Sequence, residues 1–204
     1  MEFHLPGPIR SFKDFFIHLG IVTLGILIAL GLEQIVEAHH RAKIGQDSVA
    51  GFRRELAENR EQVKEVMAAT PALRAKIAAQ IAAIGALREG DKAPLTIDYP
   101  GIYFDFIYSA SWETAIATQT LYYIPAADTR RYSAAYSAFR LFLDEERTGL
   151  ATWQDLRSFG PDAAALSPEQ RRALIQQLHR YQSYTYVIDT IGKGTLEACD
   201  QALQ

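Results

Sequence analysis

An uncharged run of 18 residues, from Phe15 to Leu32, constrains this chain more than any other feature. As an α-helix the run would be about 27 Å long, close to the thickness of the hydrocarbon core of a bilayer. It could be a cleaved export signal, a membrane anchor or a buried core helix. A cleaved signal is shorter and has a small-residue cleavage site after it, whereas Glu33 follows this run. A core helix usually has a polar stripe, which is missing here, so the sequence predicts a transmembrane anchor helix over residues 14–33.

The charges at the two ends of the run predict its orientation. Arg10 and Lys13 lie close before the run, whereas the matching pair beyond its other end, Arg41 and Lys43, lies farther away and comes after Glu33 and Glu37. Since basic residues tend to stay on the cytoplasmic side, we expect residues 1–13 to form a short cytoplasmic tail and residues 34–204 to form an extracytoplasmic helical domain. The expected location is the inner membrane of a bacterial cell, with a single crossing and a periplasmic body.

Gly25 and Ala29 are two small residues one helical turn apart within the run. Pairs of this kind let transmembrane helices approach each other closely. The alternative explanation is composition, since glycine is frequent in membrane helices in general. The pair is therefore a candidate site for association of membrane helices, and either a second copy of this chain or another membrane protein is the expected partner.

After the run, apolar side chains recur with the 3-4 spacing of a helix that packs along one seam. Nine of the twelve seam positions are apolar. Two of the polar ones, Asn59 and Gln80, are of the kind that fixes register or oligomeric state in a coiled coil. The alternative is an amphipathic helix that packs within one chain. The seam positions are Val49, Phe52, Leu56, Asn59, Val63, Val66, Thr70, Leu73, Ile77, Gln80, Ile84 and Leu87.

Pro71 falls inside this pattern. A proline removes one amide donor and disfavours helical geometry at the preceding residue. Thr70 and Pro71 also resemble the cap and the first position of a new helix. We therefore predict a kink or a tight break between helices at about 34–69 and 71–88.

Three more helices are expected. Serines precede a helix that contains Trp112 and ends at Pro125, and a second helix spans residues 128–157. The last helix begins at Ser167, where Gln170 completes a capping box. No segment shows sustained alternation with period 2. The predicted fold is all-α: a transmembrane helix that continues into a long heptad-patterned helix and an extramembrane bundle of about four or five helices.

The segment from Ala93 to Thr129 contains no Lys or Arg but has eight aromatic residues. Aromatic side chains with a few acidic neighbours can form the wall of a ligand pocket or a partner surface. They can equally form the core where the segment crosses the bundle, and this use of aromatic residues is the more common. The candidate surface residues are Tyr103, Phe106, Tyr108, Trp112 and Glu113.

No set of residues typical of catalysis or metal binding occurs in the sequence. Glu37 and His40 have the Glu-x-x-His spacing of di-iron bundles, but the second such motif is missing. Cys199, the only cysteine, excludes an intrachain disulfide and multi-cysteine metal sites, and we expect it to be a buried thiol. A net charge of −3 gives no general attraction to nucleic acid. We predict a non-enzymatic protein without a cofactor or a metal.

Three motifs carry a resemblance to known proteins. The motifs are "GILIALGLEQ" in the anchor, "FRRELAEN" in the helix after it and "WETA" before a pair of tyrosines. In these motifs the chain resembles a loose set of uncharacterised bacterial single-pass membrane proteins. The resemblance implies a membrane location and a helical body. It brings no catalytic residues to this chain.

These features predict a membrane-anchored scaffold or accessory subunit of the cell envelope that acts through protein–protein association. Its partners would be the lipid bilayer and either its own copies or another membrane protein. The alternative is an extracytoplasmic ligand-binding domain of the sensor type. Such a domain would need a signalling partner, because a tail of about a dozen residues cannot transmit a signal alone.

Overall fold

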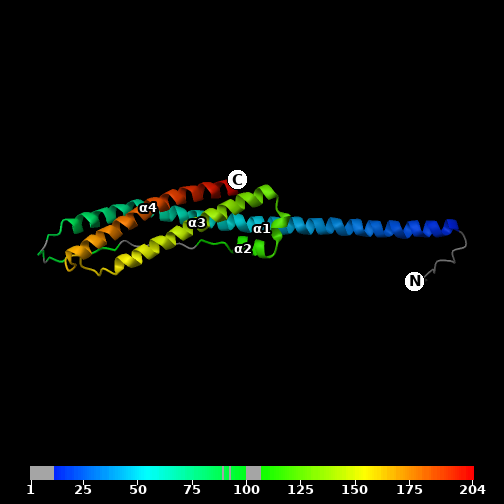
Figure 1. Ribbon diagram of the computed structural model, residues 1–204. Helices are drawn as coiled ribbons and strands as arrows, with labels where there is room; N and C mark the ends of the chain where they lie inside the picture. Colours follow the sequence, from blue (N-terminus) through cyan, green and yellow to red (C-terminus); the bar gives the residue numbers. More distant parts are fainter. Residues whose placement is uncertain (1–11, 89, 92, 100–106) are drawn as a thin grey trace, which may run out of the picture.

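The computed structural model describes residues 12–88, 90, 91, 93–99 and 107–204, which form an elongated helical molecule (Figure 1). Within these residues the elements are α1 (Phe12–Gly85), α2 (Ala110–Ala117), the 3-10 helix η1 (Thr120–Tyr123), α3 (Ala126–Arg157) and α4 (Pro168–Leu203). The first part of α1 projects alone, and its second part lies in a bundle with α3 and α4 (Figure 1). The all-α prediction is confirmed, with three long helices and two short ones in the described part of the chain.

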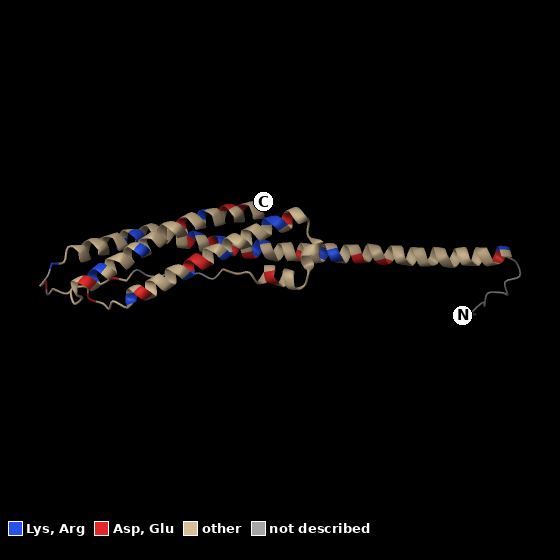
Figure 2. Cartoon of the chain, viewed as in Figure 1, with Lys and Arg blue, Asp and Glu red and all other residues tan. Residues whose placement is uncertain are grey.

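Helix α1 is 74 residues long and joins the uncharged run to the bundle without interruption. Its side chains from Phe12 to Leu30 are all exposed, including Leu24 at 59% and Ile28 at 56%. Figure 2 shows this part of α1 as an uncharged stretch with charged residues at both of its ends. The predicted continuation of the helix beyond Leu32 is therefore confirmed. Among the described elements, α1 alone is long and apolar enough to cross a membrane.

The seam of α1 faces the interior of the chain's own bundle. Nine of its twelve positions are buried and the other three are half-buried. Helix α4 packs along both α1 and α3 and so covers much of this seam. This packing agrees with the alternative of an amphipathic helix that packs within one chain.

Helix α1 also runs through Pro71, so the tight break predicted between helices at about 34–69 and 71–88 is wrong, and the alternative of a kink within one helix stays a prediction. Proline leaves the carbonyl of Met67 without its usual amide donor. The hydroxyl of Thr70 lies 2.8 Å from this carbonyl and 2.6 Å from Asp189 of α4. Arg74, one turn further along α1, donates to the same carboxylate at 2.7 Å. A polar cluster therefore supports the helix at its weakest point and attaches it to α4.

The Asp189 cluster makes stability depend on pH. Burial alone would raise the pKa of Asp189, but the hydrogen bond from Thr70 and the guanidinium of Arg74 outweigh burial and lower it. A carboxyl with a lowered folded-state pKa stabilises the protein above its unfolded pKa of about 3.9, and this contribution is lost as the pH falls through the folded value. We expect Asp189→Asn to lower the free energy of unfolding by about 1–3 kcal/mol at pH 7. In urea titrations of the full chain in micelles, this difference should close as the pH falls below about 4.

The matched control for Asp189→Asn is Asp144→Asn, which breaks an exposed ion pair with Arg147. We expect this control to change stability by less than about 0.5 kcal/mol at either pH, because solvent screens the pair. A difference between the wild type and Asp189→Asn that stays constant on acidification would contradict the role given to Asp189.

Helix α4 begins as its sequence predicts. Ser167 accepts a hydrogen bond from the amide of Gln170, whose side chain in turn accepts from the amide of Ser167. Further along, the ring of Tyr184 occupies the space that a side chain at Gly149 of α3 would need. The missing side chain at Gly149 therefore lets α3 and α4 approach closely.

The helix predicted to run from the serines to Pro125 is shorter than expected. Helix α2 ends at Ala117, and Gln119 then takes a left-handed conformation with φ of 59°, after which η1 begins. Ser109 is at the N-cap, but its side chain donates to Glu113 and caps no amide. The turn at Gln119 reverses the chain so that η1 packs on α1.

Gly45 of α1 is the point at which η1 packs. A Cβ atom built on Gly45 would lie 2.5 Å from the backbone oxygen of Tyr123. Backbone cannot move aside as a side chain can, so only glycine permits this approach without displacing η1. The contact fixes the end of the bundle to α1 at the place where α1 emerges.

We expect Gly45→Ala to lower the free energy of unfolding by about 1–3 kcal/mol, because the added methyl group overpacks the contact with η1. Urea unfolding of the full chain in micelles measures this loss. The control is Gly194→Ala in α4, where a Cβ atom would meet nothing within 4 Å and alanine favours the helix by up to about 1 kcal/mol. Equal effects of the two variants would contradict the close contact at Gly45.

Candidate functional site

The residues just before α2 are held by Asn59 of α1. Its side-chain amide donates to the backbone oxygen of Tyr108 at 2.7 Å, and its side-chain oxygen accepts from the amide of Tyr108 at 2.8 Å. Both backbone groups of Tyr108 are thereby satisfied, as buried polar groups require. Asn59 is fully buried, and its hydrogen-bonding groups are used within the chain. Its expected role in fixing an oligomeric state is therefore replaced by a role in positioning Tyr108.

Helix α2 is attached to the bundle through Glu55. The two carboxylate oxygens of this buried residue accept from the amide of Ser111 at 2.9 Å and from the hydroxyl of Tyr136 at 2.7 Å. A carboxylate next to the first amides of a helix is favourable because these amides have no partner within the helix. Burial, and then the bond to Glu55, raises the pKa of Tyr136 far above its ordinary value, so Tyr136 stays protonated as the donor.

Aromatic rings pack around this attachment. Trp112 stacks on Tyr136 with 5.1 Å between ring centroids, and Phe52 meets the edge of Trp112 at 5.4 Å. Trp112 is only 7% exposed and belongs to the hydrophobic core. The core interpretation of the aromatic segment therefore holds for Trp112.

A cavity of about 270 Å³ lies beside this stack, between the start of α2 and helix α3. Three of the predicted surface residues, Tyr108, Trp112 and Glu113, line it together. The other two, Tyr103 and Phe106, lie outside the described residues. The remaining lining residues are Ile107, Ser109, Tyr136, Phe139, Arg140, Leu143, Asp144 and Arg147.

The lining of this cavity divides into an apolar part and a charged rim. Rings and aliphatic side chains of the core form the apolar part. Glu113, Arg140, Asp144 and Arg147 are exposed and form the rim. A concave apolar surface with a few charged groups is typical of a site for a small ligand.

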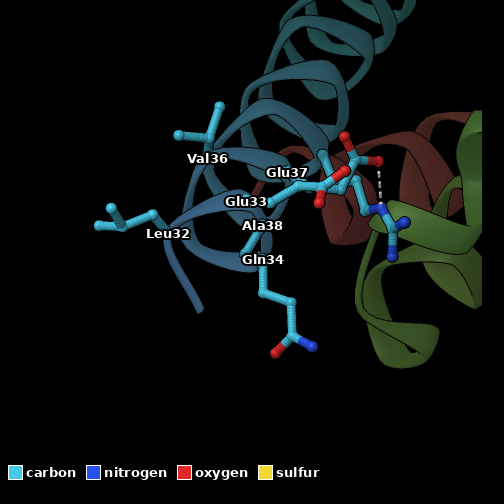
Figure 3. Close-up of a pocket in the computed structure, with 7 residues that line it drawn as sticks. Leu32, Glu33, Gln34, Val36, Glu37 and Ala38 are labelled. Atoms are coloured by element: carbon cyan, nitrogen blue, oxygen red, sulfur yellow. Dashed lines mark hydrogen bonds and ion pairs between the residues drawn. The ribbon is translucent and has the colours of Figure 1, made fainter. Parts of the chain in front are cut away.

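Two other hollows are poorer candidates. One, of about 490 Å³, is an open groove between α1 and α2 that is lined mainly by small and hydroxyl side chains. The other lies along α1, where the labelled residues of Figure 3 all come from a single helix. Its only bonded pair is Glu37 with Arg41, at 2.7 Å. Because one helix cannot enclose a ligand, we regard this second hollow as exposed helix surface.

The remaining candidate residues are placed as follows. Gly25 and Ala29 lie on the exposed part of α1, where a Cβ atom at Gly25 would meet nothing within 4 Å. His40 is likewise exposed on α1. Cys199 is buried as predicted, its thiol donates to the backbone oxygen of Leu56 at 3.4 Å, and burial raises its pKa to about 11. A thiol with this pKa stays protonated at neutral pH and is a poor nucleophile.

Comparisons with protein-family models, curated proteins and solved structures found no match to this chain. The resemblance to bacterial single-pass membrane proteins therefore stays a prediction.

Sequence reasoning missed Glu55, Tyr136 and Arg140 as parts of the site. Glu55 is next to the seam of α1, and glutamate is seldom buried, so nothing in the sequence marks it as a buried residue. Arg140 lies on the face of α3 that borders the cavity, which nothing in the local sequence reveals. The usable signal was Asn59, a polar residue in an apolar seam, although its partner is 49 residues away.

Proposed function

We propose that this chain is a single-pass membrane-anchored protein of the cell envelope that acts without catalysis, through protein–protein association. The exposed apolar part of α1 carries this proposal. Its leucine, isoleucine, valine and phenylalanine side chains are exposed, and none of the apolar stretch is buried against the described part of the chain. Exposing such a surface to water costs a free energy of roughly 25 cal/mol for each Å² of apolar area. A lipid bilayer is the environment that fits an uncharged helix of this length.

The stalk, residues 33–44 of α1, supports a body that stands away from the membrane. Nearly all its side chains are exposed, and it is about 18 Å long at 1.5 Å per residue. The headgroup layer takes up only about 5–8 Å on each side of a bilayer. The bundle would therefore be held beyond the headgroups by a continuous helix.

The proposed orientation has the N-terminus in the cytoplasm of a bacterial cell and the bundle in the periplasm. It rests on Arg10 and Lys13 before the apolar run and on Glu33 after it. Fusions of alkaline phosphatase and of green fluorescent protein to Gln204 test it. We expect an active phosphatase and a dark fluorescent protein, and the reverse result would overturn the orientation.

The exposed part of α1 is also the proposed association surface, because the bundle covers the seam. Gly25 and Ala29 would let a second transmembrane helix approach closely, either from a second copy or from another membrane protein. Cysteine cross-linking at Val22 in native membranes, in a Cys199→Ala background, tests this. We expect cross-linked products that disappear when Gly25→Leu is added but persist with the control Gly20→Leu. Absence of any product would overturn self-association through this face.

A second candidate function is ligand binding by the bundle, working with a signalling partner. It is favoured by the cavity in which Tyr108, Trp112 and Glu113 come together. Titration of small molecules into the full chain, as described below, tests it independently of association.

A further inference from the structure

We propose that the cavity beside α2 binds a small zwitterion, an amino acid with an apolar or aromatic side chain. This inference rests on the second candidate function and names its ligand class. Three features favour this ligand: the size of the cavity, the apolar part of its lining, and two charged residues of its rim that form no ion pair within the described part of the chain.

The size of the cavity suits a molecule no larger than a single amino acid. Its volume of about 270 Å³ equals that of about nine water molecules at ~30 Å³ each. The apolar lining from Ile107, Phe139 and Leu143, together with the Trp112–Tyr136 stack, suits an apolar or aromatic side chain.

The rim carries four charges, of which two neutralise each other. Arg147 donates to Asp144 at 2.9 Å. Glu113 accepts a hydrogen bond from the hydroxyl of Ser109 at 2.6 Å, and no cation in the described part of the chain pairs with it. The guanidinium of Arg140 likewise has no hydrogen bond or ion pair within the described residues.

One cation and one anion at the same rim complement a ligand that carries both charges. Arg140 would bind a carboxylate through its fork of donors, and Glu113 would accept from an ammonium group. A simple carboxylic acid would approach Glu113 with a like charge, and a simple amine would approach Arg140 in the same way. A zwitterion avoids both repulsions while its apolar part enters the cavity.

The backbone at the start of α2, which forms one wall of the cavity, is held by α1 before any ligand arrives. Asn59 holds the backbone of Tyr108, and Glu55 holds the amide of Ser111, so both ends of the segment before Trp112 are bonded to α1. A site whose walls are held in this way loses little conformational entropy on binding.

Fluorescence of Trp112 tests the proposal in the full chain. Trp153→Phe leaves Trp112 as the only tryptophan, since the sequence contains two. The probes are L-phenylalanine, L-leucine, 3-phenylpropionate without the ammonium group, and phenethylamine without the carboxylate. We expect saturable binding of the two amino acids and at least tenfold weaker binding of the two singly charged probes.

Variants of the rim separate the two charges. We expect Arg140→Gln and Glu113→Gln each to weaken binding of L-phenylalanine about tenfold, the effect of losing one charge-assisted hydrogen bond. Arg140→Gln should strengthen phenethylamine binding, because it removes the like charge that an amine meets at the rim. The matched control is Arg130→Gln, an exposed arginine on the same helix that does not line the cavity. Far-UV circular dichroism verifies that each variant is folded.

Three results would overturn the proposal. These are the absence of saturable binding by either amino acid, tighter binding of 3-phenylpropionate than of L-phenylalanine, and equal binding by Arg140→Gln and the wild type. None of these results bears on membrane association, which the cross-linking at Val22 tests separately.

Discussion

A double variant, Leu24→Arg with Ile28→Arg, is expected to leave the membrane fraction. Both side chains are exposed and lie near the centre of the uncharged run. Arginine at the centre of a transmembrane helix costs about 2.5–3.5 kcal/mol on insertion scales, so the pair costs about 5–7 kcal/mol. Alkaline carbonate extraction of cell membranes measures the effect. The wild type should remain in the pellet and the double variant should appear in the supernatant or be degraded.

The matched control places two arginines on the exposed surface of the bundle, as Leu141→Arg with Val187→Arg. These side chains are 57% and 43% exposed, comparable with the positions in α1. We expect this control to stay in the membrane pellet. A double variant at Leu24 and Ile28 that resisted extraction as the wild type does would contradict a transmembrane role for α1.

The second large effect is expected from Phe52→Ala. Phe52 is fully buried and touches Trp112, Tyr132 and Tyr136 with ring centroids 5.2–6.1 Å apart. Truncating a buried phenylalanine costs about 3–5 kcal/mol through lost burial and the cavity it leaves. Urea unfolding of the full chain in micelles, followed by near-ultraviolet circular dichroism, should show this loss.

Leu141→Ala is the control for Phe52→Ala. Leu141 is more than half exposed on α3, so we expect a change within about 0.5 kcal/mol. If Phe52→Ala were as mild as Leu141→Ala, the ring of Phe52 would not be central to the packing of α2 against the bundle.

Local features predicted the parts of the fold that depend on neighbours in the sequence. The apolar run, the seam of α1 and the capping box at Ser167 each lie within a few helical turns, where spacing alone is informative. Their placement agrees with the structure, except that Pro71 does not end α1. The hydroxyl of Thr70 compensates locally at Pro71, but its second partner, Asp189, lies 119 residues further on, where no local pattern reveals it.

The candidate site was harder to predict because it forms between distant segments. The sequence identified Tyr108, Trp112 and Glu113 from composition, and the structure places all three on one cavity. It did not separate their roles: Trp112 belongs to the core, whereas Glu113 is at the rim. Which of these side chains is in the core and which is at the rim depends on where α2 ends and on which face of α2 is turned towards α3. The left-handed turn at Gln119 sets that end, and Gln119 has no sequence signal comparable to glycine.

The central claim is that α1 crosses the bilayer and then leaves it as an uninterrupted helix that carries the bundle. Spin labels at Leu24, Val36 and Lys43, each in a Cys199→Ala background, test this claim by electron paramagnetic resonance of the protein in lipid vesicles. The claim predicts that oxygen, which concentrates in the bilayer, relaxes the label at Leu24 strongly while a water-soluble nickel complex does not. The labels at Val36 and Lys43 should respond mainly to nickel. A label at Leu24 as accessible to nickel as the label at Lys43 would contradict the claim.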